Sequence, residues 1–182
     1  MCTNFCRAPD GNLAGKTRRA AYKASGGGGT ACKGDVGEGR KIFFGRSACY
    51  TCHSVGPDGG EFGPDLTNIG EIRSRHDILE AIMYPNASFA REYETYQVET
   101  KTNTYTGVIA EQLSDAIILT IGPGPGIRIP RTDIVSIEPD HVSMMPPGLD
   151  QQLSVAEMAD LIAFLEALPY DIDRLIEARE RE

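Results

Sequence analysis

The pentapeptide Cys49-Tyr50-Thr51-Cys52-His53 constrains the fold of this 182-residue chain more than any other feature. C-x-x-C-H is the attachment signature of a c-type haem. Two thiols three positions apart in one helical turn can each add to one vinyl group of the porphyrin, and the next residue then lies under the iron. A neutral imidazole there can serve as the proximal ligand. The motif therefore predicts one haem c per chain, bound covalently through Cys49 and Cys52 and ligated by His53.

Two other kinds of site use similar cysteines. A structural zinc site needs four ligands, usually in two separated pairs. The sequence has no second C-x-x-C and no H-x-x-x-H, so the fourth ligand would have to be a residue such as Cys32. A thioredoxin-like redox pair belongs in a βαβ context, and His53 would then be incidental. We expect Cys2, Cys6 and Cys32, which lie in flexible-looking sequence, to be unconstrained thiols.

Composition and charge limit the class of protein. With 41% hydrophobic and 24% charged residues, the chain has the composition of a soluble globular protein. No stretch approaches the roughly 18 to 20 apolar residues that cross a membrane. Residues 1–34 hold six basic residues and one acidic residue, a net charge of +5. Because the whole chain has a net charge of −8, residues 35–182 carry −13. An acidic body disfavours nucleic acid and suits redox partner proteins that present a basic docking surface.

The expected location follows from the haem. Covalent haem attachment takes place outside the cytoplasm, so we expect a periplasmic or otherwise exported protein. The N-terminus lacks the apolar core of a secretory signal peptide. We therefore expect this sequence to be a fragment or a truncated form of an exported protein.

Changes in pattern divide the chain. Residues 1–34 contain four consecutive glycines, a flexible linker composition, and predict a linker or the remnant of an upstream domain. The predicted domain at 35–170 has helical segments at both ends and strands between them, and a charged tail follows. The expected boundaries are helical segments at 35–92 and 141–170, a strand-rich segment at 93–140 and a tail at 171–182.

Capping residues and apolar spacing predict three helices, at about 36–46, 77–83 and 155–168. Asp35 is a good N-cap for the first, and Ser154 with Glu157 forms a capping box for the last. Gly39 and Phe43 share one face of the first helix. The glycine would allow another helix to approach closely, with Phe164 available to meet this face if the terminal helices cross.

Two loops hold further ligand candidates. In the turn-rich segment 54–70, the Pro64 carbonyl is our candidate to accept the imidazole Nδ1–H and fix its tautomer. A plain β-turn would explain the same turn residues equally well. In the loop 143–149, two methionines precede two prolines. A thioether is a soft ligand for haem iron, and stiff prolines reduce the entropy lost in holding it. Met145 is the first candidate and Met144 the second.

Between these loops, residues 93–140 are rich in β-branched residues that alternate with polar ones. Four or five short antiparallel strands are expected, interrupted by the breaker Gly122-Pro123-Gly124-Pro125-Gly126. The segment contains no histidine or cysteine, so we assign it no chemistry.

Taken together, these residues resemble a class I cytochrome c. The resemblance rests on Gly39 to Phe43, the C-x-x-C-H motif, Gly63-Pro64-Asp65-Leu66, the methionine loop and the capped last helix. More closely, the chain resembles the haem-binding domain of planctomycete and verrucomicrobial type over about residues 35–170. That family implies a mainly α fold, with a helical core around one haem and a small antiparallel sheet inserted between the proline and methionine loops. It also implies His53 and Met145 as axial ligands of the iron, with Pro64 supporting His53.

The function that we expect is one-electron transfer without substrate chemistry. The domain would be the electron-transfer module of a larger exported redox protein and would serve a fused or partner dehydrogenase. An alternative is a haem-based gas sensor with a displaceable distal ligand. A variant has His76 or His141 as the distal ligand in place of methionine. Peroxidase activity needs acid and base groups beside an open iron site, and nothing in the sequence marks them.

Overall fold

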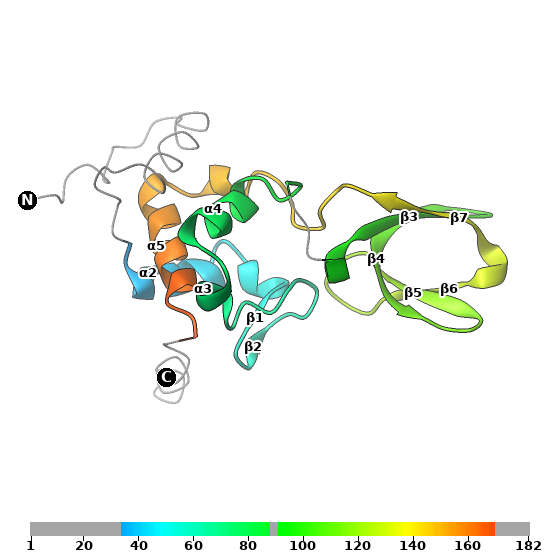
Figure 1. The fold of residues 1–182 in the computed structure, drawn as a ribbon, viewed down its shortest axis with the longest axis horizontal. Coiled ribbons are helices and arrows are strands. Elements are labelled where there is room, and N and C mark those ends of the chain that lie inside the picture. Colours follow the sequence, from blue (N-terminus) through cyan, green and yellow to red (C-terminus); the bar gives the residue numbers. More distant parts are fainter. Residues whose placement is uncertain (1–33, 88–90, 170–182) are drawn as a thin grey trace, which may run out of the picture.

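The computed structural model of the protein describes residues 34–87 and 91–169 (Figure 1). A helical part lies at one end of the molecule and a strand-rich part at the other, and two segments of the chain join them. Among the described helices, none has the length and apolar character that a membrane crossing needs. Several sequence-based predictions fall outside the described residues: the linker at 1–34 (Gly34 excepted), the tail at 171–182, and the state of Cys2, Cys6 and Cys32.

Short helices build the helical part around one core. Along the chain they are α2 (Val36–Phe44), η1 (Cys49–Thr51), α3 (Ile69–Ile72), α4 (Arg75–Met83), η2 (Arg91–Tyr93), η4 (Leu149–Gln152) and α5 (Val155–Glu166). The three η elements are single 3-10 turns. Two very short strands, β1 (Ser54–Val55) and β2 (Asp58–Gly59), pair as a hairpin after η1.

Side-chain caps determine where the helices begin. The Asp35 carboxylate accepts a hydrogen bond at 2.9 Å from a backbone N–H in the first turn of α2, so the predicted N-cap is confirmed. This helix ends at Phe44, two residues before its predicted end. Helix α4 begins at Arg75, two residues earlier than predicted, because Ser74 and Asp77 form a capping box. Asp77 is therefore the third residue of the helix and not its first.

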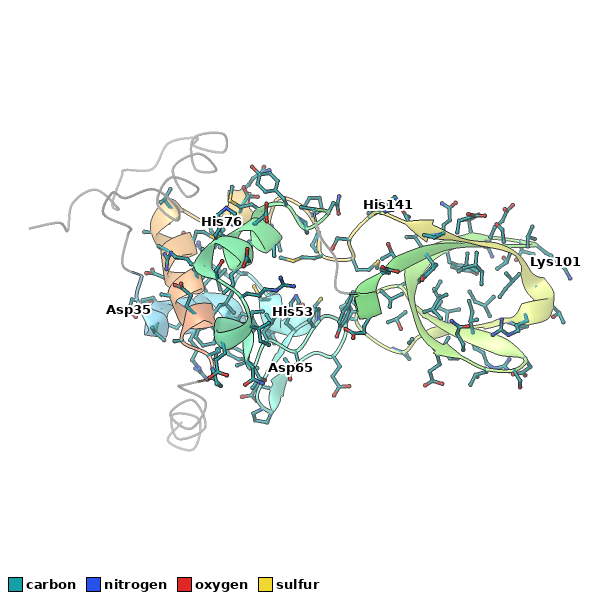
Figure 2. The ribbon with its side chains drawn as sticks, viewed as in Figure 1. Asp35, His53, Asp65, His76, Lys101 and His141 are labelled. Atoms are coloured by element: carbon teal, nitrogen blue, oxygen red, sulfur yellow. The ribbon has the colours of Figure 1, made fainter. Side chains whose placement is uncertain are left out.

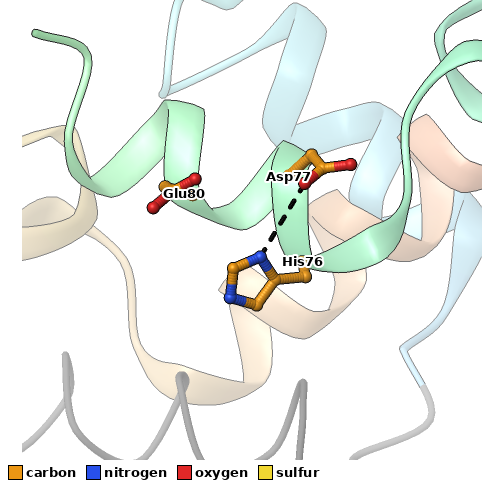
Figure 3. A group of neighbouring side chains, drawn as sticks. All are labelled: His76, Asp77 and Glu80. Carbon is orange, nitrogen blue, oxygen red and sulfur yellow. Dashed lines mark ion pairs between the residues drawn. The ribbon is translucent and has the colours of Figure 1, made fainter. Parts of the chain in front are cut away.

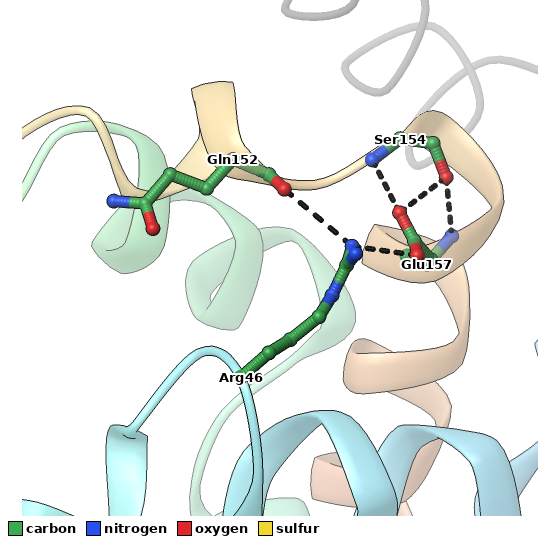
Figure 4. A network of polar contacts seen from close by, with 4 residues as sticks. All are labelled: Arg46, Gln152, Ser154 and Glu157. Carbon is green, nitrogen blue, oxygen red and sulfur yellow. Dashed lines mark hydrogen bonds and ion pairs between the residues drawn. The ribbon is translucent and has the colours of Figure 1, made fainter. Parts of the chain in front are cut away.

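The predicted capping box at the start of α5 is confirmed (Figure 4). The Ser154 hydroxyl and backbone N–H each lie within 2.8 Å of a Glu157 carboxylate oxygen. Arg46 reaches the same carboxylate at 2.5 Å and the Gln152 carbonyl at 3.4 Å. Burial acts to raise the pKa of Glu157, but the hydrogen bonds from Ser154 and Arg46 outweigh it and lower that pKa. The segment just before the motif is thus tied to the start of α5.

Helices α2 and α5 pack closely against each other. A Cβ atom added at Gly39 would lie 2.0 Å from the Asp160 carbonyl oxygen, so no larger residue fits there without a shift of the helices. The Phe43 and Phe164 rings pack with their centroids 5.6 Å apart. Asp35 N donates to Asp160 Oδ1 at 2.7 Å. The predicted crossing of the terminal helices is confirmed.

Helices α3 and α4 complete the helical core by packing on α5. A Cβ atom at Gly70 would lie 2.4 Å from the Glu166 carbonyl oxygen, so α3 approaches α5 as closely as a glycine allows. The buried side chains of this helical core are Ile42, Phe43, Val55, Ile78, Leu79, Ile82, Met83, Leu153, Met158, Leu161, Ile162, Phe164, Leu165 and Leu168.

The strand-rich part is one antiparallel sheet with the order β6-β5-β4-β3-β7. Its strands are β3 (Thr95–Thr100), β4 (Thr104–Gln112), β5 (Ala116–Thr120), β6 (Ile127–Pro130) and β7 (Ile134–Asp140). The 3-10 turn η3 (Arg131–Asp133) joins β6 to β7, the two edge strands. A connection of three residues requires these edges to approach each other, so the sheet curls around its own core (Figure 1).

The core of the sheet is separate from that of the helices. Val98, Ile117, Leu119 and Ile129 are buried in it, and Tyr96 and Ile137 are among the half-buried residues that pack around them. The predicted antiparallel strands are confirmed. The expectation of a mainly α chain is not, because among the described residues the strands contain about as many residues as the α-helices.

Candidate functional site

The C-x-x-C-H motif forms a tight turn at the end of the segment that follows α2. Cys49 begins the 3-10 turn η1, and His53 N donates to the Cys49 carbonyl at 3.0 Å. Ala48, just before the turn, has a φ of 51°, in the left-handed region. Both cysteines are free thiols. The turn therefore presents two thiols and the imidazole of His53 from one short piece of backbone.

The imidazole of His53 is oriented by the proline loop. Its Nδ1 lies 2.8 Å from the Pro64 carbonyl oxygen. A carbonyl can only accept a hydrogen bond, so Nδ1 carries the proton and Nε2 keeps its lone pair. Burial lowers the pKa of His53, and the hydrogen bond to Pro64 opposes that effect without cancelling it. At neutral pH the ring is therefore uncharged, and Nε2 can bind a metal.

Gly63 also lies against the imidazole, and no feature of the sequence predicts this contact. A Cβ atom at this position would lie 2.6 Å from Cε1 of His53 and 2.8 Å from its Nδ1. The proline loop therefore approaches the ring as closely as a glycine allows. Backbone hydrogen bonds tie the loop to the motif: Gly60 N to Tyr50 O at 2.8 Å, Gly63 N to Cys52 O at 2.7 Å and Leu66 N to Ser54 O at 2.9 Å.

The burial of Cys49 affects two alternatives to a haem site, a thioredoxin-like redox pair and a zinc site. Burial raises the pKa of its thiol to about 11. A reactive cysteine pair of the thioredoxin kind depends on a lowered thiol pKa, so this thiol is poorly suited to that chemistry. Within 34–87 and 91–169, the side chains that could together hold a metal ion include neither cysteine of the motif. Cys32, the stray zinc-ligand candidate, lies outside those ranges.

The methionine loop borders the helical core. Met145 is half-buried and packs against this core, and so does Cys49 of the motif. Met145 N donates to Ser143 Oγ at 3.1 Å, which fixes the backbone before the two prolines. Met144 is also half-buried, but among the described residues it is not one of those that pack against the helical core. The packing therefore favours Met145 over Met144.

The other two histidines of the sequence belong to different elements (Figure 2). His76 lies in α4, where its Nδ1 is 3.8 Å from Asp77 Oδ1 (Figure 3). Glu80 completes a group that could hold a cation. Asp77 is engaged by the cap of α4, and Asp77 and Glu80 are exposed. His141 is exposed directly after β7. Of the three histidines, His53 is the one whose ring the Pro64 carbonyl engages.

Sequence similarity supports a family for the site, since residues 36–118 match the family model of cytochrome c. This stretch is similar to cytochrome c. The matched stretch includes the motif and the proline loop and ends within β5, before the methionine loop and α5. No curated protein matches the chain. The finer resemblance to the planctomycete and verrucomicrobial type stays a prediction.

A cytochrome c domain implies covalently bound haem and, in general, electron transfer by its iron; such domains are typically exported. The residues of this chain fit that group. Cys49 and Cys52 offer two free thiols. The neutral ring of His53 keeps Nε2 for iron because Nδ1 is engaged by the Pro64 carbonyl.

Proposed function

We propose that this cytochrome c domain is a one-electron carrier. Cys49 and Cys52 hold one haem c, and His53 and Met145 are its axial ligands. The observation that supports the proposal most strongly is the 2.8 Å hydrogen bond from His53 Nδ1 to the Pro64 carbonyl, directly after two free cysteines. When bound, the haem supplies an iron that alternates between the ferric and ferrous states.

The surrounding residues have two tasks in this proposal. The Pro64 carbonyl makes Nε2 of His53 a better electron donor by accepting a hydrogen bond from Nδ1–H. The thioether of Met145 raises the reduction potential relative to a nitrogen ligand. Both ligands are carried by loops that pack against the helical core, so little reorganisation is needed when the charge of the site changes by one.

We also propose a place for the domain in a larger exported, periplasmic redox protein. It would pass electrons for a fused or partner dehydrogenase and would catalyse no reaction itself. The chain has a net charge of −8. This charge favours partners with a basic docking surface, through attraction that added salt would weaken.

Replacing Met145 tests the distal ligand. Met145→Ala should abolish the near-infrared sulfur-to-iron band of the ferric protein, because no thioether would then reach the iron. Met144→Ala, the matched control on the neighbouring residue, should keep the band. Visible and near-infrared spectra of protein matured with haem in an exporting host provide the measurement. The wild type should be low-spin and six-coordinate in both oxidation states.

Other spectra would contradict this assignment. Loss of the band only in Met144→Ala would move the ligand to Met144. A wild type without the band, whose spectrum changes in His76→Ala or His141→Ala, would indicate two histidine ligands. Rapid binding of carbon monoxide by the ferrous wild type would favour a gas sensor over an electron carrier.

A substitution at Gly63 tests the proximal side. In Gly63→Ala the new methyl group would overlap the His53 ring, so we expect the hydrogen bond to the Pro64 carbonyl to lengthen or break. The loss should be about 1 kcal/mol. It should appear as faster solvent exchange of the imidazole Nδ1 proton by NMR and as a lower Tm of the haem-bound protein. Gly122→Ala, whose Cβ atom would meet nothing within 4 Å, is the control. Equal exchange rates in both variants would contradict this role of Gly63.

A further inference from the structure

The methionine loop is held from the side of the sheet by the first residue of β3. Thr95 is 1% exposed and is one of two buried polar or charged residues in the part of the chain that the structure describes. Its hydroxyl donates to the Val142 carbonyl at 2.8 Å and also lies 3.2 Å from the Asp140 carbonyl. Val142 comes three residues before Met145. The hydroxyl thus extends the pairing of β3 with β7 by two residues, to Val142 directly before the methionine loop.

From the helical side, Asn86 holds the same loop. Asn86 follows the end of α4, and its Oδ1 accepts a hydrogen bond from Ser143 N at 2.8 Å. The Ser143 hydroxyl in turn accepts from Met145 N at 3.1 Å. The first contact joins residues 57 apart in sequence. The second reaches the backbone of Met145 itself. The backbone before Met145 is therefore fixed from both parts of the molecule.

We propose that Thr95 and Asn86 are positioning residues for the methionine loop, and that the sheet acts as a clamp that keeps Met145 at its place. This inference depends on the proposed role of Met145 as a ligand. Neither residue would hold the haem itself, and each acts through the backbone of 142–145. The clamp gives the sheet a task, although the sheet contains no ligand residue of its own.

The clamp should determine how readily an external ligand replaces Met145. Imidazole added to the ferric protein binds the iron only when the methionine loop moves away, so its apparent affinity measures the opening of the loop. Thr95→Val keeps the shape of the side chain and removes the hydroxyl. We expect imidazole affinity to rise about tenfold in this variant, as for the loss of one buried hydrogen bond. Loss of the near-infrared sulfur band during the titration is the measurement.

Matched variants separate this role from general stability. Thr95→Ser restores the hydroxyl and should return the affinity to that of the wild type. Thr100→Val, at the other end of β3, removes a hydroxyl that donates to the Asn103 carbonyl at 2.7 Å and should leave the affinity unchanged. A tenfold rise in this control as well would overturn the clamp in favour of general loosening of the sheet.

Substitutions at Asn86 provide the second arm, because this exposed side chain can be replaced with little risk to folding. Asn86→Ala should raise imidazole affinity and speed amide exchange of Ser143, whereas Asn86→Asp keeps an acceptor oxygen and should not. Unchanged affinity and exchange in both Thr95→Val and Asn86→Ala would overturn the inference while leaving Met145 as ligand. A wild type that lacks the sulfur band would instead overturn the proposed function and the inference with it.

Discussion

The double substitution Cys49→Ala and Cys52→Ala is expected to abolish covalent haem attachment completely. No other pair of thiols in the described structure stands beside a histidine whose Nδ1 is engaged, so nothing would replace the motif. The intact mass of protein matured in an exporting host should lack the added porphyrin. Each single variant should keep one thioether bond and show a shifted spectrum, because one vinyl group stays unreacted.

The control for this experiment is Cys32→Ala, the same substitution at a cysteine outside the motif. It should bind haem at the level of the wild type. Haem that stays covalently attached in the double variant would refute the role of Cys49 and Cys52. Wild-type protein that carries zinc and no porphyrin after maturation would refute the proposed function itself.

The second large effect is expected in the contact of the two terminal helices. Gly39→Ala places a methyl group 2.0 Å from a backbone oxygen of α5, which cannot rotate away as a side chain would. Helices α2 and α5 must then separate, and the packing of Phe43 on Phe164 loosens. Overpacking of this kind costs about 3 kcal/mol of the free energy of unfolding. Guanidinium denaturation of the haem-bound protein, followed by far-UV circular dichroism, measures the loss.

Gly37→Ala is the matched control, because it is the same substitution two residues away on the exposed side of α2. The nearest atom to the new methyl would be an Asp35 carboxylate oxygen at 3.3 Å, a side-chain atom that can adjust. Alanine also favours the helix over glycine, so the free energy of unfolding should change by less than about 1 kcal/mol. Similar losses in both variants would show that helix propensity, and not close packing, explains the effect at Gly39.

Local sequence signals predicted much of this structure correctly. The N-cap at Asp35 and the capping box at Ser154 depend on side chains within three residues of the groups that they bond, so they can be recognised in a linear sequence. The start of α4 was misplaced for a related reason. An aspartate is favourable at any position in the first turn of a helix, so Asp77 does not mark the first residue. Only the structure shows that Ser74 is the cap.

The proportions of helix and strand are harder to predict from the sequence. The alternating pattern of 93–140 correctly predicted antiparallel strands. The resemblance to a mainly α family led to too low an expected proportion of strand residues in the described chain. The curl of the sheet follows from the short turn between its two edge strands. Strand order depends on pairings between distant segments, which alternation within each strand does not specify.

The candidate site divides in the same way. The sequence by itself determined the chemistry, since the C-x-x-C-H motif specifies two thiols and an imidazole at fixed spacing whatever surrounds them. Tertiary structure alone decided the close contact of Gly63 with the ring of His53. It also decided that Thr95 and Asn86 reach the methionine loop. These contacts join residues up to 57 positions apart and leave no periodic pattern, so they exist only after the chain has folded.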